Sequence, residues 1–131
     1  MNLFKKTFLV VLALSAFSTT SFLCSQTNDT LKTPVSQSHI DRAKAKTEIM
    51  AKELSLTPEQ QELVAGAIAR RDFDNSLKTR GLTTPEEKSV VYRVTYLEFV
   101  ATLKTKLPSS IVNKIGTWEA EYKERIKNQS K

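Results

Sequence analysis

Apolar and polar residues follow a helical period over most of the chain, and this pattern predicts four helices. Apolar or small residues recur every three or four positions, so each segment places them on one face. The four segments span about residues 38–54, 58–80, 85–107 and 109–127. We therefore expect an all-α fold of antiparallel helical hairpins in a bundle arrangement.

The first predicted helix has one narrow apolar stripe. Its expected N-cap is Ser38, with Asp41 three residues further on. The stripe consists of Ile40, Ala43, Thr47, Met50 and Leu54. Basic residues occupy the other side, so this helix should pack through a single face.

The second and third predicted helices begin with the same local pattern. A threonine can cap with its hydroxyl, a proline follows at the first helical position, and an acceptor side chain stands three residues after the cap. These residues are Thr57, Pro58 and Gln60 in one helix, and Thr84, Pro85 and Glu87 in the other. Such a cap contributes on the order of 1 kcal/mol to stability, so both helix starts are strongly indicated.

The second predicted helix has a mixed face. Leu63, Ala67 and Leu77 share a face, with Val64 and Ile68 beside them. Arg70 and Asp74 lie in the middle of this face, and their spacing of four residues allows them to pair. Gly81 is the expected stop, in a left-handed conformation.

The third segment is apolar on two sides when read as a helix. One seam consists of Val90, Val94, Leu97 and Ala101, and the other of Tyr92, Tyr96, Phe99, Leu103 and Leu107. Its β-branched and aromatic residues would also suit a strand, but more than twenty residues without glycine or an internal proline exceed an ordinary strand. We expect the aromatic seam to pack on the fourth helix, to which Leu107 leads. Val90, Val94 and Leu97 then remain as the candidate surface for a partner, a client or a second copy.

The fourth segment is regularly amphipathic. Its apolar positions are Ile111, Ile115, Trp118, Tyr122 and Ile126. Glu119 with Lys123, and Glu121 with Arg125, are spaced four apart, and we expect each pair to interact along the helix surface.

The first residues resemble a secretory signal peptide. Lys5 and Lys6 precede an apolar run over 8–17, and small polar residues follow. Cleavage could follow Ser18, Ser21 or Ser25, and Ser25 is the preferred position. The run has roughly ten residues against the ~20 of a membrane span, so we expect a periplasmic protein with no span in its mature form. Lipid attachment at Cys24 is the less favoured alternative, because the residues before it fit a lipoprotein signal poorly.

Residues 26–37 lack an apolar period and are expected to be a flexible linker before a single helical domain at 38–128. Loss of the first 25 residues would lower the net charge from +6 to +4, with 18 basic against 14 acidic residues. The two signs alternate along the chain. Together with export, this argues against a nucleic-acid partner.

The residues carry little catalytic chemistry. The single histidine, His39, has no second histidine or cysteine at metal-ligand spacing, and no glycine-rich phosphate loop is present. Acidic neighbours such as Glu86 and Glu87 stand at helix starts, where they favour the helix dipole. We expect a non-enzyme without a metal or cofactor.

The stretch "LTPEQ" from Leu56 to Gln60, in an exported, basic, all-helical chain of this size, resembles the LTxxQ family of bacterial periplasmic proteins, the Spy and CpxP type. Members carry two such motifs, several tens of residues apart. Here "LPSSI" begins at Leu107, 51 positions after Leu56, with Pro108 in the place of threonine and Ile111 in that of glutamine.

The resemblance implies a thin cradle-like arrangement of the helices, curved and usually dimeric, that holds unfolded or stressed envelope proteins without ATP. Leu56, Thr57, Gln60 and Leu107 would be motif residues with a structural role. The function it implies is that of an ATP-independent chaperone-like or envelope-stress binding protein. Two alternatives stay open: a regulatory partner of the sensor domain of an envelope-stress kinase, and a surface lipoprotein of structural role.

Overall fold

The computed structural model describes residues 33–131, of which Val35–Lys131 form one compact unit. The expected signal peptide, its cleavage site, Cys24 and most of the expected linker lie outside the described residues.

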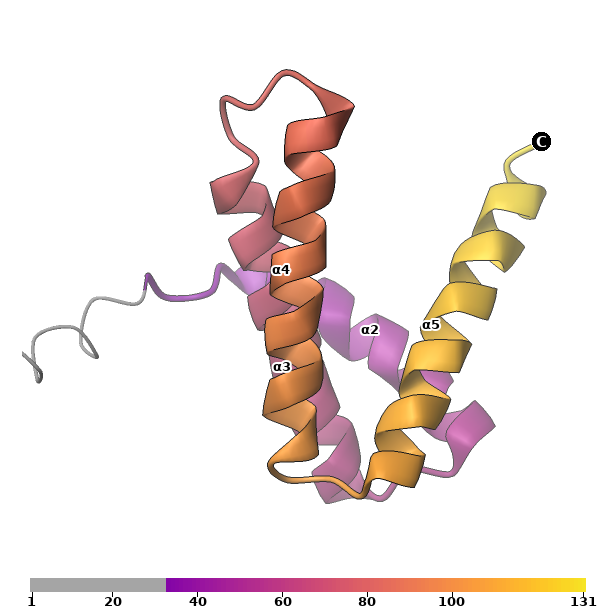
Figure 1. Ribbon diagram of the computed structural model, residues 1–131. Helices are drawn as coiled ribbons and strands as arrows, with labels where there is room; N and C mark the ends of the chain where they lie inside the picture. Colours follow the sequence, from indigo (N-terminus) through magenta and orange to yellow (C-terminus); the bar gives the residue numbers. More distant parts are fainter. Residues whose placement is uncertain (1–32) are drawn as a thin grey trace, which may run out of the picture. The chain divides into compact units, whose positions relative to one another are not determined.

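Four α-helices make up this unit, and they are drawn in Figure 1. Their bounds are Gln37–Leu54 for α2, Pro58–Lys78 for α3, Pro85–Lys104 for α4 and Ser109–Gln129 for α5. Residues 33–131 contain no strand. The expected all-α fold is confirmed, and the segment that could also have been a strand is the helix α4.

The two predicted capping boxes are present. The Thr57 hydroxyl oxygen accepts a hydrogen bond from the Gln60 backbone N–H at 3.2 Å, and the Gln60 side chain accepts one from the Thr57 N–H at 3.0 Å. Thr84 and Glu87 form the same reciprocal pair at the start of α4. The local pattern was therefore sufficient to locate both helix starts.

The expected N-cap of the first helix was wrong. The helix α2 begins one residue before Ser38, and its N-cap is Ser36, whose side chain makes no capping hydrogen bond. The Ser36 hydroxyl lies instead 2.6 Å from Nδ1 of His39. The ring of His39 meets the ring of Phe73 edge-on, and this histidine is partly buried.

Two helices end earlier than expected. The helix α3 stops at Lys78, and Gly81 adopts its left-handed conformation, φ +88°, in the connection that follows. The helix α4 stops at Lys104 rather than at residue 107. Leu107 precedes a proline, which disfavours helical backbone at that residue, and its buried side chain packs in the core before α5 begins.

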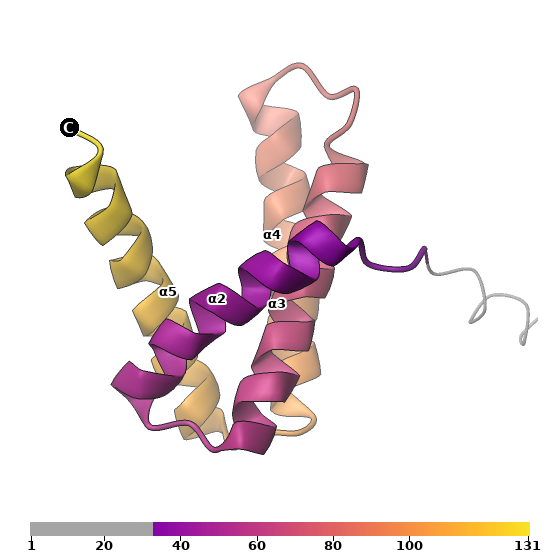
Figure 2. The same cartoon turned by 180° about the vertical axis from the view of Figure 1, so that it is seen from behind.

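The core draws on all four helices. The helices α3 and α4 run side by side as an antiparallel hairpin, and α2 crosses α3, as the opposite views of Figures 1 and 2 show. The core cluster consists of Ala43, Met50, Val64, Ile68, Ala69, Phe99, Leu103, Leu107, Val112, Ile115 and Trp118. In both views α5 leaves the end of α4 and diverges from it. The amino-terminal half of α4 therefore has α3 beside it but lacks close cover from α5.

Candidate functional site

The helix α4 exposes an apolar stripe directly opposite its buried side. Val90, Val94 and Leu97, the α4 stripe, are 64%, 44% and 59% exposed. The buried side of the same helix carries Phe99 and Leu103. The structure thus leaves the predicted candidate surface open, while its role in binding stays a prediction.

The aromatic seam of α4 is only partly buried, contrary to expectation. Phe99 and Leu103 belong to the core, whereas Tyr92 and Tyr96 are 49% and 41% exposed. The cause is the divergence of α5, which approaches α4 closely only near their connection. A Cβ atom added at Gly116 of α5 would lie 3.2 Å from the Tyr96 hydroxyl. The hydroxyl end of Tyr96 therefore still lies close to the backbone of α5.

Between α4 and α5 lies a groove, the tyrosine groove, of about 630 Å³. It contains all three tyrosines of the chain, Tyr92 and Tyr96 from α4 and Tyr122 from α5, together with the exposed Ile126. The Tyr122 ring stacks on Trp118, with ring centroids 4.6 Å apart. The groove therefore offers aromatic surface on both walls.

A network of four charged residues lies in the floor of the tyrosine groove. Glu119 of α5 accepts hydrogen bonds from Arg71 of α3 through both carboxylate oxygens, at 2.8 and 3.0 Å. It also accepts one from Lys46 of α2 at 2.6 Å, while Arg71 donates to Asp72 at 3.0 Å. The expected pairing of Glu119 with Lys123 was wrong, because Glu119 turns toward α2 and α3 and joins three helices.

Both central members of this network are nearly buried, and both stay charged. Burial alone would raise the pKa of Glu119, but hydrogen bonds and charge from Arg71 and Lys46 outweigh it and hold that pKa below its usual value. Burial likewise opposes the charge on Arg71, yet Glu119 and Asp72 raise its pKa further. The guanidinium of Arg71 also lies 4.5 Å from the centre of the Phe99 ring.

A second cross-helix clamp holds α5 to the end of α2. The Trp118 indole N–H donates to Glu53 at 2.6 Å, and Arg125 donates to both oxygens of the same carboxylate at 3.1 Å. These hydrogen bonds, led by that of Arg125, lower the pKa of Glu53. The expected partner of Arg125 was Glu121, which still acts on Arg125 through its charge, but the ion pair forms with Glu53. The pair expected between Arg70 and Asp74 is present at 2.8 Å.

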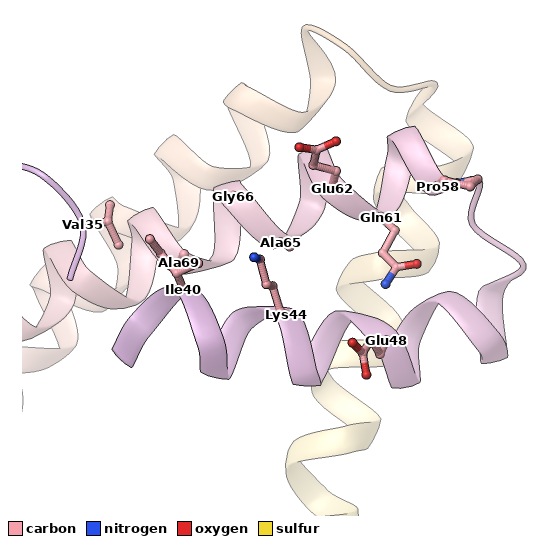
Figure 3. A pocket seen from close by; sticks show the side chains of 10 residues that line it. All are labelled: Val35, Ile40, Lys44, Glu48, Pro58, Gln61, Glu62, Ala65, Gly66 and Ala69. Atoms are coloured by element: carbon pink, nitrogen blue, oxygen red, sulfur yellow. The ribbon is translucent and has the colours of Figure 1, made fainter. Parts of the chain in front are cut away.

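A different groove, of about 610 Å³, lies between α2 and α3 (Figure 3). Its floor includes the small residues Ala65, Gly66 and Ala69, and Figure 3 shows Lys44 extending from α2 toward them. Glu48 and Glu62 stand at its sides. Val35 and Ile40 add apolar surface to this groove, but none of its lining residues is aromatic, whereas three tyrosines line the tyrosine groove. It is therefore the weaker candidate for holding a polypeptide.

The motif residues lie at the turn into α3 and in the core. Thr57 and Gln60 make the cap, and Leu56 packs against the core cluster. Leu107 belongs to that cluster. None of the four lines the tyrosine groove, so the motif and this groove are separate features.

Comparison with known proteins gives no match to a family model, a curated protein or a solved structure. Among the helices of residues 33–131, none combines the length and the apolar character that crossing a membrane requires. Within the same residues, His, Cys, Asp and Glu side chains form no cluster of three or more suited to a metal ion.

Sequence reasoning overlooked the residues that shape the groove floor. Arg71 and Asp72 follow Arg70 directly, and nothing in the local pattern marks Arg71 as the partner of a residue 48 positions away. One signal was available, because Arg71 stands three positions after Ile68 and seven after Val64, both apolar residues of α3. Charged residues at such positions are almost always paired.

Proposed function

We propose that the protein is an exported, ATP-independent binding protein of chaperone type. The observation that carries the proposal is that α4 exposes large apolar side chains on two sides, the α4 stripe and the tyrosine groove. Contiguous exposed apolar surface is characteristic of protein-binding sites. The resemblance of "LTPEQ" at Leu56–Gln60 to the LTxxQ motif, and the signal-peptide pattern, support the same class of protein.

The tyrosine groove is the proposed client site. Its aromatic walls can contact apolar side chains of many kinds without demanding one shape, and tyrosine adds a hydroxyl that can bond to an exposed backbone. The charges of the floor are already engaged with one another, so an apolar segment could enter without stripping a charge of its partner. Such a site favours unfolded polypeptides over a single defined ligand.

Suppression of aggregation tests this proposal. The purified protein should reduce light scattering of a chemically denatured model protein at near-stoichiometric ratio, equally with and without ATP. Replacing Tyr92 and Tyr96 together by serine should weaken this effect while leaving helical circular dichroism unchanged, because both side chains are about half exposed. Ile49→Ser is the matched control, since Ile49 is similarly exposed and lies outside the groove. No suppression by the folded wild-type protein at any ratio would refute the proposal.

The number of partners separates a chaperone from a regulator. Crosslinking in envelope extracts should capture many proteins at low yield if the tyrosine groove accepts unfolded segments. A single stoichiometric partner, a folded sensor domain for example, would contradict the chaperone function. Mass spectrometry of the mature N-terminus tests export, with cleavage after Ser25 as the expected result and an acylated Cys24 as the contrary one.

A further inference from the structure

We propose that a basic pocket beside the tyrosine groove binds one carboxylate of the polypeptide that enters the groove. The pocket, called the Arg42 pocket below, has a volume of about 480 Å³. The helix α2 supplies His39, Arg42 and Lys46 to it, α3 supplies polar side chains, and α4 supplies Tyr92. The pocket adds a chemical preference to the client site, so its role rests on the function proposed above.

Arg42 is the cation of this pocket that has no anionic partner. Lys46 pairs with Glu119, and Asp72, the acidic residue of the pocket, pairs with Arg71. Within residues 33–131 no ion pair involves Arg42, and its one side-chain hydrogen bond runs from Nε to a backbone oxygen of its own helix. The terminal nitrogens of its exposed guanidinium therefore remain able to donate to a ligand.

Neutral hydrogen-bond donors accompany this charge. The side-chain oxygen of Asn75 accepts a hydrogen bond from the Thr95 hydroxyl, which leaves the NH2 group of Asn75 as a donor for a ligand. The exposed Ser76 and the half-exposed Tyr92 add two hydroxyl groups to the same pocket. A carboxylate offers two acceptor oxygens, so a guanidinium beside neutral donors suits it.

The charge of the pocket favours a carboxylate over a phosphate. The planar guanidinium of Arg42 matches both anions, but a phosphate monoester carries between about 1.5 and 2 negative charges at neutral pH. The Asp72 carboxylate, which is 44% exposed, lines the same pocket. A second negative charge on the ligand would meet repulsion from Asp72 without a free cation to offset it.

The Arg42 pocket continues into the tyrosine groove, because the two hollows share Lys46, Asp72, Asn75 and Tyr92. Arg42 stands four residues before Lys46, about 6 Å along α2. The Lys46 Nζ atom lies 5.9 Å from the centre of the Tyr122 ring on the far wall of the groove. Roughly three to four residues of extended chain span this path, so a segment with a carboxylate three or four residues from a large apolar side chain fits both parts.

Fluorescence anisotropy with three dye-labelled peptides tests this pairing. All three contain the same phenylalanine. One ends three residues later in a free carboxylate, the second ends there in an amide, and the third ends in an amide but has aspartate at that last position. The wild-type protein should bind at least one acidic peptide about tenfold more tightly than the uncharged amide, equivalent to about 1.4 kcal/mol. The two acidic peptides show whether a chain end or a side chain supplies the carboxylate.

Arg42→Gln should abolish the preference for the acidic peptides and leave the affinity for the uncharged amide unchanged. Arg93→Gln is the matched control, since Arg93 is also exposed and lines neither the Arg42 pocket nor the tyrosine groove. Both variants lower the net charge by one, so a general attraction between charges would affect them equally. Helical circular dichroism should be unchanged in both, because both side chains are exposed.

Three results would overturn the carboxylate site: equal affinity for all three peptides, an undiminished preference in Arg42→Gln, or an equal loss of preference in Arg93→Gln. Displacement of the acidic peptides by less inorganic phosphate than acetate would also overturn it, since the pocket would then prefer the more highly charged anion.

The uncharged amide peptide separates this proposal from the function on which it rests. If this peptide binds and aggregation is suppressed, while the acidic peptides bind no more tightly, only the carboxylate site fails. If no peptide binds and aggregation is not suppressed, both proposals fail.

Discussion

Removing the charge of Glu119 should destabilise the protein more than any other single change to an ion pair. Glu119 is the carboxylate that α2 and α3 share, through Lys46 and Arg71. Its side chain is 11% exposed and that of Arg71 is 12% exposed. The substitution Glu119→Gln keeps the size and shape of the side chain, so the effect reports the charge rather than a cavity.

The expected loss is about 3 kcal/mol. Removing one partner of a buried ion pair typically costs about 3–5 kcal/mol, because the remaining charge stays buried without compensation. Two features of the site favour the lower end of this range. Arg71 retains Asp72 as a partner, and Lys46, whose side chain is 24% exposed, can turn toward water. A loss of this size is a large share of the ~5–15 kcal/mol that stabilises a domain.

Urea unfolding followed by circular dichroism measures this loss. With a urea dependence of ~1–3 kcal/mol per molar for a small protein, the midpoint should fall by about 1 to 3 M. Glu98→Gln is the matched control, since Glu98 pairs with Lys78 at 3.7 Å while both side chains remain about half exposed. Exposed pairs contribute ~0–1 kcal/mol, so the control should unfold close to the wild-type midpoint.

Equal midpoints for the two variants would refute this reasoning. That result would mean that Glu119 is solvated in the folded protein and that its ion pairs hold α5 no more strongly than an exposed ion pair would. A second contrary result would be a Glu119→Gln variant whose free energy of unfolding depends less steeply on urea while its midpoint is unchanged. It would show that α5 detaches before the rest of the unit unfolds.

Three further predictions concern acid stability, the core and the caps. Because folding lowers the pKa of Glu119, this carboxylate contributes to the stability of the folded protein above its unfolded pKa of about 4.5, and the contribution is lost as the pH falls below that value. In thermal melts from neutral to acid pH, the melting temperature of Glu119→Gln should therefore fall less steeply than that of the wild type. An equally steep fall in both proteins would contradict this prediction. Leu103→Ala should lower the free energy of unfolding, measured in urea, by ~2–5 kcal/mol, because Leu103 is fully buried. Leu97→Ala, on the exposed side of the same helix, should lower it by under about 0.5 kcal/mol. Similar losses for the two variants would show that the α4 stripe is part of the core. Thr57→Ala should lower the free energy of unfolding by about 1 kcal/mol. Ser36→Ala should lower it measurably less, since the Ser36 side chain makes no capping hydrogen bond. Equal losses for the two variants would contradict the assigned caps.

The four helical segments, and the starts of α3 and α4, could be predicted from the sequence because their causes are local. The cap at Thr57 involves residues at most three positions apart. The segment that forms α4 is longer than an ordinary strand, and this length favours a helix. Even the exposed side of α4 could be inferred, since a helix that is apolar on two sides cannot bury both against one neighbour. The pair of Arg70 and Asp74 follows from the same short range.

The tertiary structure decided which charged residues meet and where the surface is hollow. Glu119 and Arg125 each had a candidate partner four residues away, yet both bind residues of other helices. Tyr92 has the spacing of a core residue but remains half exposed. The common reason is the angle at which α5 leaves α4, which depends on packing among all four helices. Local spacing states which side of a helix is apolar, but only that angle determines how much of it is covered.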